Sequence, residues 1–157
     1  MKKNIVKIII AILVVILVVF VGVKLYEANV EIKPKDMIIT NYDGSDSVTA
    51  EIGTYNWSRN GKYVVADSIS AQDMEYMQVL NVKKNEKIYF SNYDWTKSSA
   101  VIILKNNAGE AVQLVIDSNP EECSVTIPNI SGTQILQIDW EAPKGKVWYS
   151  AKVNVIE

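Results

Sequence analysis

An uninterrupted apolar run near the N-terminus constrains this chain more than any other feature. The run covers Ile8–Val23, 16 residues, with three lysines before it and only Lys24 close behind it. Together with its apolar neighbours it reaches about 20 residues, which is long enough to cross the hydrocarbon layer of a membrane as a helix. The excess of lysines before the run predicts that the N-terminus stays in the cytoplasm and that the remainder is exported.

Two interpretations of this run remain open, an uncleaved signal anchor and a cleaved secretory signal. A cleavable signal ends in a small-x-small site. A cut after Ala28 would place the bulky Tyr26 in that site, and a cut after Gly22 would place Phe20 there. These residues favour the anchor and a single-pass protein of the cell membrane, whereas cleavage would give a secreted protein. The expected organisation is a cytoplasmic N-terminus and transmembrane anchor at 1–26, a tether at 27–36 and an extracytoplasmic domain at 37–157.

Charge is divided unevenly along the chain. Four of the 16 basic residues precede Tyr26, whereas all 18 acidic residues follow it, so the exported part has 12 basic residues and a net charge of about −6. A nucleic-acid partner needs basic surface that neutralises phosphates, so we expect no nucleic acid. The same balance argues against close electrostatic attachment to anionic lipids or anionic wall polymers. The expected partners are the membrane, through the single span, and an envelope protein or glycan.

One cysteine and no histidine restrict the chemistry of the chain further. A single cysteine allows no intramolecular disulfide, and Cys123, which precedes the alternating stretch Ser124–Ile127, is expected to be a small buried hydrophobe. The absence of histidine removes Ser-His-Asp and Cys-His nucleophile pairs, histidine general bases and most catalytic zinc sites. We therefore expect no metal site, no cofactor and no catalytic residue.

After Val30 the apolar residues recur with a period of two rather than 3.6. Short β-branched runs separated by turn residues are typical of an all-β sandwich or barrel. A run that ends in Trp140, followed by a hairpin into a last strand, favours an immunoglobulin-like antiparallel β-sandwich preceded by one transmembrane helix, an architectural analogy that implies no function. The expected elements include strands at Val48–Ile52, Ala100–Lys105, Ala111–Ile116, Ser124–Ile127, Thr133–Trp140 and Lys146–Val155, and a short helical piece near Ser70–Met77.

The two C-terminal strands show the alternation most clearly. In Thr133–Trp140 the more apolar face, which ends in Trp140, is expected to point inward. In the last strand five apolar side chains share one face: Val147, Tyr149, Ala151, Val153 and Val155.

The segment Ile52–Ser68 is the most distinctive stretch after the apolar run. It holds Gly-Thr-Tyr-Asn-Trp at 53–57, a glycine-containing turn at 60–61 and Ala-Asp-Ser at 66–68. Together with Trp140 and the closing stretch Gly145–Val153, it resembles uncharacterised extracytoplasmic β-sandwich proteins of Gram-positive bacteria that carry a GTYxW…G…ADS motif. Ala151 departs from that pattern, which has a bulkier aromatic residue there. The resemblance implies a membrane-anchored or lipid-anchored surface domain and implies no activity.

Tyr55, Trp57 and Asp67 are the candidate ligand-binding residues. Two residues apart on one strand, Tyr55 and Trp57 share a face. If that face is exposed, they form an aromatic platform for a sugar ring or a peptide, with Asp67 as a polar partner. The alternative is core packing across a hairpin that turns at Asn60-Gly61, with Asp67 bonded to loop amides. Core packing is the preferred interpretation, and the ligand platform is kept as the second.

Three further segments offer polar side chains. Asp43–Ser47 is an acidic turn whose oxygens suit calcium, but no calcium-loop pattern follows, so a plain connecting turn is preferred. Asn92–Thr96 is a polar-aromatic loop that we expect Trp95 to anchor in the core. Glu121 and Glu122 are adjacent, so on a strand they point to opposite faces and cannot flank one glycosidic bond together.

The leading expectation is a non-catalytic single-pass membrane protein that presents its β-domain for binding, sensing or structural support at the cell envelope. The alternative is a carboxylate-dependent enzyme that acts on cell-wall sugars or peptides through side chains such as Asp67 and Asp94. A cleft that holds two carboxyl groups about 5–10 Å apart would favour the enzyme.

Overall fold

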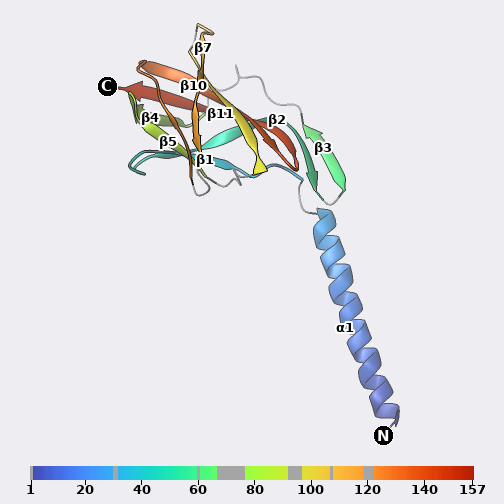
Figure 1. Cartoon of the computed structure of the whole chain (residues 1–157). Coiled ribbons are helices and arrows are strands. Elements are labelled where there is room, and N and C mark those ends of the chain that lie inside the picture. Colours follow the sequence, from blue (N-terminus) through green and yellow to red (C-terminus); the bar gives the residue numbers. More distant parts are fainter. Residues whose placement is uncertain are drawn as a thin grey trace. The chain divides into compact units, whose positions relative to one another are not determined.

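A computed structural model of the chain describes residues 2–29, 32–59, 61–66, 77–91, 97–106, 108–118 and 122–157. The chain divides into two compact units, Met1–Glu31 and Ile32–Glu157. The first unit is one helix, and the second is a β-domain (Figure 1).

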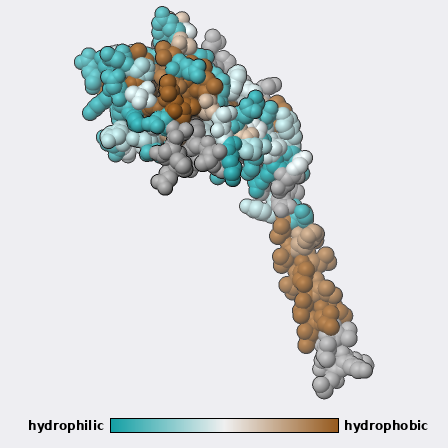
Figure 2. All heavy atoms as spheres, in the orientation of Figure 1, coloured by the Kyte–Doolittle hydropathy of each residue, from teal (hydrophilic) through white to brown (hydrophobic). Residues whose placement is uncertain are grey.

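The N-terminal unit is the helix α1, Lys2–Asn29. Within it, Lys7–Tyr26 is 20 residues long and apolar enough to cross a membrane. At 1.5 Å per residue this stretch is about 30 Å long, which matches the hydrocarbon thickness of a bilayer. Its apolar side chains are exposed along the helix (Figure 2). The predicted apolar helix is confirmed, as a membrane span or a signal sequence, and its orientation and cleavage stay predictions.

The β-domain consists of strands that all belong to one hydrogen-bonded sheet. The prediction that the chain after the apolar helix is mostly β is therefore confirmed. The described strands are β1 (Met37–Asn41), β2 (Ser47–Arg59), β3 (Lys62–Ala66), β4 (Val79–Lys83), β5 (Lys87–Ser91), β6 (Ser99–Lys105), β7 (Ala111–Leu114), β8 (Ile116–Ser118), β9 (Cys123–Thr126), β10 (Gly132–Ala142) and β11 (Gly145–Ile156).

The sheet curls until its two ends nearly meet. Its order is β7-β6-β10-β11-β2-β1-β5-β9-β8, with β3 beside β2 and β4 beside β11. Strands β7 and β8 stand at opposite ends of this order, yet only Val115 separates them in the chain. Because successive Cα atoms are about 3.8 Å apart, those of Leu114 and Ile116 cannot be more than about 8 Å apart. The path that begins at β7 must therefore return to it.

The β-domain consequently resembles a nearly closed barrel more than a sandwich with two clear layers. The described strand pairs are antiparallel, as predicted, except that β4 runs parallel to β11. The alternation of a strand indicates which face is inward and says nothing about which edges pair. For this reason the curl was not visible in the sequence.

Strand β2 connects the two halves of the sheet and contains an irregularity. Its first residues pair with β1, and its later residues pair with β11 on one side and β3 on the other. Along β11 the register shifts between Val147 and Tyr149, so that Gly53 and Thr54 of β2 face the single residue Trp148. Such a β-bulge adds one residue to a strand, bends it and increases the local twist.

The bulge changes which side chains of β2 face the core. Before it, Val48 and Ala50 are buried, so the even-numbered side chains point inward. After it, Trp57 is buried and Tyr55 packs against the core. Without the extra residue, the alternation that begins at Val48 would send Tyr55 and Trp57 to the outer face.

The interior of the β-domain is one cluster of apolar side chains from both halves of the sheet. The inward faces predicted for the two C-terminal strands are confirmed. Their buried residues are Gln134, Leu136, Ile138 and Trp140 on β10, and Val147, Tyr149, Ala151, Val153 and Val155 on β11.

Some expected elements differ from the structure or fall outside it. The expected strand Ala111–Ile116 is interrupted at Val115, which is 87% exposed, so β7 pairs with β6 and β8 pairs with β9. The sequence hides this break because valine is a good strand former. Strand β1, which the pattern did not single out, lies between β2 and β5. The helical piece expected near Ser70–Met77 lies outside the described residues, apart from the buried Met77.

Candidate functional site

The structure places two of the three candidate residues. Trp57 on β2 is only 8% exposed and belongs to the core cluster. Tyr55 is half-buried and packs against the same cluster. Asp67 lies outside the described residues. Tyr55 and Trp57 share a face, and it is the face that the bulge turns inward.

Strands β2 and β3 form the hairpin that the sequence indicated. Arg59 pairs with Lys62, which leaves Asn60 and Gly61 as the connection. Gly61 has a φ of 74°, a left-handed conformation that glycine adopts without steric penalty. The hairpin also places Val64 opposite Trp57, so β3 covers one edge of the strand that carries the tryptophan.

The two segments that carry the family resemblance lie side by side in the sheet. Trp57 of β2 is opposite Gly145 of β11, and Asn56 is opposite Lys146. The side-chain oxygen of Asn56 accepts a hydrogen bond from the Lys146 backbone N–H at 3.0 Å. A Cβ atom at Gly145 would lie 1.9 Å from the Asn56 carbonyl oxygen. Only glycine fits at this contact, which joins the distinctive residues into one structural unit.

An open pocket with a volume of about 520 Å³ adjoins this unit. Trp57 and Trp140, both buried, are among its lining residues. Five exposed cationic side chains also line it, and none of the described lining residues is acidic. We call this site the cationic pocket, and its cations are Lys33, Lys35, Arg59, Lys97 and Lys144.

Long-range hydrogen bonds fix the backbone on two sides of the cationic pocket. Ser58 donates from its backbone N–H and from its hydroxyl to the Lys144 carbonyl oxygen, at 2.7 and 2.9 Å. Tyr149, which is fully buried on β11, donates its hydroxyl hydrogen to the Lys35 carbonyl oxygen at 2.8 Å. The backbone that carries Lys35 and Lys144 is therefore held in place independently of any ligand, which is the arrangement expected of a preorganised site.

Basic residues are frequent among the described residues that line the cationic pocket. Five of the 12 basic residues that follow Tyr26 line it, although that part of the chain has a net charge of about −6. Sequence reasoning missed the site because its cations come from four separate segments of the chain. The one local signal is the pair Lys33 and Lys35 shortly after the apolar helix.

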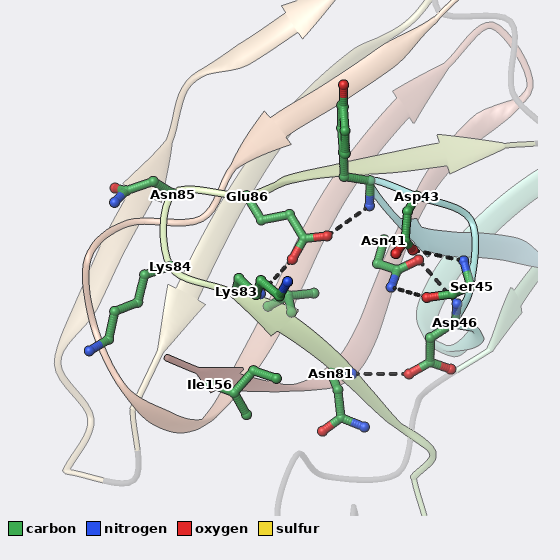
Figure 3. A pocket seen from close by; sticks show the side chains of 12 residues that line it. Asn41, Asp43, Ser45, Asp46, Asn81, Lys83, Lys84, Asn85, Glu86 and Ile156 are labelled. Carbon is green, nitrogen blue, oxygen red and sulfur yellow. Dashed lines mark hydrogen bonds between the residues drawn. The ribbon is translucent and has the colours of Figure 1, made fainter.

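A second pocket, of about 540 Å³, lies between the β1–β2 and β4–β5 turns, and we call it the polar pocket (Figure 3). Its carboxylates accept hydrogen bonds from backbone amides. Asp46 accepts from the Asn81 N–H at 3.2 Å, and Glu86 accepts from the N–H groups of Tyr42 and Lys83. These contacts tie the two turns together, so the polar lining has a structural explanation.

The acidic turn Asp43–Ser47 forms one wall of the polar pocket. Hydrogen bonds from the Ser45 hydroxyl and backbone N–H lower the pKa of the Asp43 carboxyl. Asn41 donates to the Ser45 hydroxyl at 3.0 Å and accepts from the Asp46 N–H at 3.1 Å. The turn is thus an internally bonded connection. Within the described part of the chain, no group of three or more His, Cys, Asp or Glu side chains is placed to hold a metal ion.

Among the remaining candidate residues, Cys123 is buried, Glu122 is exposed and the others lie outside the described residues. Cys123 is 1% exposed, and removal from water raises the pKa of its thiol to about 12, with a further contribution from the Asp117 carboxylate. Because the thiolate is the reactive form, this thiol is inert in the folded domain near neutral pH. The Asn92–Thr96 loop and Glu121 fall outside the described residues.

No protein-family model matches the chain, and no curated protein or solved structure matches it significantly. The resemblance to extracytoplasmic proteins of Gram-positive bacteria therefore stays a prediction. The function has to be argued from the geometry of the two units themselves.

Proposed function

We propose that this chain is a single-pass membrane protein that presents its β-domain outside the cell as a non-catalytic binding module of the envelope. The observation that carries the proposal is the cationic pocket, which exposed cations from separate segments line together with the buried Trp57 and Trp140. Helix α1 supports it, because its 20-residue stretch Lys7–Tyr26 is long and apolar enough to hold a domain at a membrane. The lysines before the apolar run support an external β-domain.

We also propose that the β-domain is a strongly curled relative of immunoglobulin-like sandwiches. Its support is the closing hairpin of β10 and β11, in which Trp140 is buried. An experimental structure in which the strands separate into two layers would favour the sandwich. Continuous pairing from β7 round to β8 would favour the barrel.

Topology is tested with the full chain carrying one epitope at each end and expressed in a Gram-positive host. Protease is added to intact cells after wall removal, and membranes are washed at alkaline pH. We expect the C-terminal epitope to disappear and the N-terminal epitope to stay with the membrane. Protection of the C-terminal epitope would refute an external domain, and a mature protein that begins near Asn29 would refute the anchor.

The binding role is tested by photo-crosslinking in intact cells. A photoreactive residue replaces Ser98, which lines the cationic pocket, or Thr49, an exposed residue of β2 that does not line it. We expect specific crosslinked products from position 98 alone. Equal products from both positions, or none from position 98, would contradict binding at this pocket.

A further inference from the structure

We infer that the free edge of β3 pairs with the β3 edge of a second copy of this chain, so that two β-domains share one continuous sheet. This inference goes beyond the proposed function and does not use the cationic pocket. It depends on the open edge of β3, on two exposed apolar side chains there and on a register in which the strand complements itself.

Strand β3 ends the sheet beside β2. Among the described strands it pairs only with β2, and Figure 1 shows none of them beyond it. A free edge presents N–H and C=O groups that another strand can bond, and proteins usually block such edges with proline, bulges or charged side chains. Strand β3 contains no proline, its register with β2 is continuous, and its one charged residue, Lys62, stands at its first position. The rest of this edge is open to a partner strand.

The hydrogen bonds of β2 determine which backbone groups of β3 point to the free edge. The Ser58 N–H donates to the Lys144 carbonyl oxygen, which lies on the side of β2 that faces β11. Ser58 and its neighbour Tyr63 on β3 are therefore a non-hydrogen-bonded pair. Bonded and non-bonded pairs alternate along an antiparallel ladder. The backbone N–H and C=O groups of both Tyr63 and Val65 consequently point away from β2.

The side chains of the same two residues are large, apolar and exposed. Tyr63 is 61% exposed and Val65 is 60% exposed. They share one face of β3, since residues two apart on a strand point to the same side. A strand that adds to this edge brings its own side chains against them and removes part of their apolar surface from water.

A second β3 complements this edge when the two copies run antiparallel with Val64 at the centre. Tyr63 of each copy then lies opposite Val65 of the other, and these two bonded pairs supply four backbone hydrogen bonds. Aromatic and β-branched side chains make favourable cross-strand pairs. Each Lys62 lies opposite Ala66, so the two lysines are about 13 Å apart along the strands, where salt screens most of their repulsion. This register pairs every residue of β3.

A contact between two short strands is small, so the dimer is reversible. Stable interfaces bury about 1,200–2,000 Å², which is more than two five-residue strands can cover. If α1 anchors two copies in one membrane, their high effective concentration favours the contact.

Disulfide formation in the full chain, in micelles of a neutral detergent, tests the register. The two copies of Val64 form a non-hydrogen-bonded pair whose Cα atoms are about 4.5 Å apart, a distance that a disulfide spans. V64C is oxidised beside T49C, whose cysteine is exposed on the part of β2 that pairs with β1. We expect a disulfide-linked dimer from V64C. From T49C and from the parent chain, whose Cys123 is buried, we expect only the background of random collisions.

Sedimentation equilibrium in density-matched detergent measures the strength of the contact. V65P removes an N–H that points away from β2, so the β2–β3 hairpin keeps its own bonds while the dimer loses two of its four. Each bond is worth about fivefold in an equilibrium constant, so V65P should weaken dimerisation about 30-fold. V65T keeps the N–H and the β-branched shape and should stay within about threefold of the parent. Thermal unfolding of both variants checks that the fold is intact.

Each outcome supports or overturns the pairing of two β3 edges. A V64C dimer above the T49C background, together with the larger loss in V65P, would support it. A parent chain that stays monomeric, V64C no better than T49C, or equal losses in V65P and V65T would overturn it. V64C is also oxidised in intact cells, where a product with a different protein in place of the homodimer would assign the edge to another chain and overturn the inference. These results leave the tests of topology and of binding at the cationic pocket unaffected.

Discussion

Replacement of Gly145 by alanine tests the contact on which the β2–β11 junction depends. Gly145 has a φ of 144°, and an added Cβ would lie 1.9 Å from the carbonyl oxygen of Asn56. The neighbouring atom is backbone in a paired strand and cannot rotate away. The substitution therefore forces the two strands apart at the turn that carries Lys144.

The expected loss of stability has two parts. A non-glycine residue in such a backbone conformation costs about 1–3 kcal/mol. Separation of the strands also weakens the bonds from Ser58 to the Lys144 carbonyl and from the Lys146 N–H to Asn56, each with a net contribution of about 1 kcal/mol. The expected total is about 3–6 kcal/mol, a large share of the 5–15 kcal/mol that typically stabilises a domain.

Gly61→Ala provides the control in the same region of the sheet. Gly61 also has a positive φ, of 74°, but an added Cβ there would meet nothing within 4 Å. The only remaining cost is that of the left-handed backbone conformation for a residue other than glycine, which is about 1–2 kcal/mol. Urea unfolding of the full chain in neutral detergent, followed by tryptophan fluorescence, gives the free energies of unfolding for both variants and the parent.

The comparison of the two variants decides whether the contact at Gly145 matters. A loss at Gly145 that exceeds the loss at Gly61 by about 2 kcal/mol or more would support the junction. Equal losses would refute the reasoning, because they would mean that the strands accommodate the methyl group without separating.

Three further predictions use the same unfolding assay or simple labelling. Tyr149→Phe removes the bond to the Lys35 carbonyl and should lower the free energy of unfolding by about 1 kcal/mol; an unchanged value would mean that the hydroxyl does not hold this segment. Trp57→Ala should lower the free energy of unfolding by about 3–5 kcal/mol. Replacement of Trp148, which is 50% exposed, should lower it by less than about 1 kcal/mol. Near-native stability of Trp57→Ala would restore the interpretation of Tyr55 and Trp57 as an exposed platform. The pKa of the Cys123 thiol is raised to about 12 in the folded domain, from about 8.5 in the unfolded chain. The contribution of the protonated thiol to stability is therefore complete below about pH 8.5 and is lost as the pH rises towards 12. Rapid alkylation of Cys123 in the folded protein at pH 8 would contradict the raised pKa.

Alternation along single strands was the most dependable guide to the β-domain. Leu136, Ile138 and Val153 point inward as their spacing predicted, because strand geometry sends every second side chain to one face. The same reasoning identified the hairpin of β2 and β3 from Asn60-Gly61. Each of these predictions needed only a few neighbouring residues.

The candidate site was predictable only in part. The sequence singled out Tyr55 and Trp57, and the structure places Trp57 among the residues that line the cationic pocket. The sequence did not single out Lys97 or Lys144 as residues that line the same pocket as Trp57. Nothing in the local sequence around a lysine indicates which distant segment will lie beside it.

The sequence by itself determined the apolar helix, the β class of the remainder and the inward faces of strands with unbroken alternation. Composition and a period of two residues contain that information, because they follow from transfer out of water and from local backbone geometry. Only the tertiary structure decided the curl of the sheet, the β-bulge that turns Trp57 inward and the presence of five basic residues in the pocket that Trp57 also lines. Those features depend on which strands pair and in what register, and that choice is made by contacts between residues far apart in the chain.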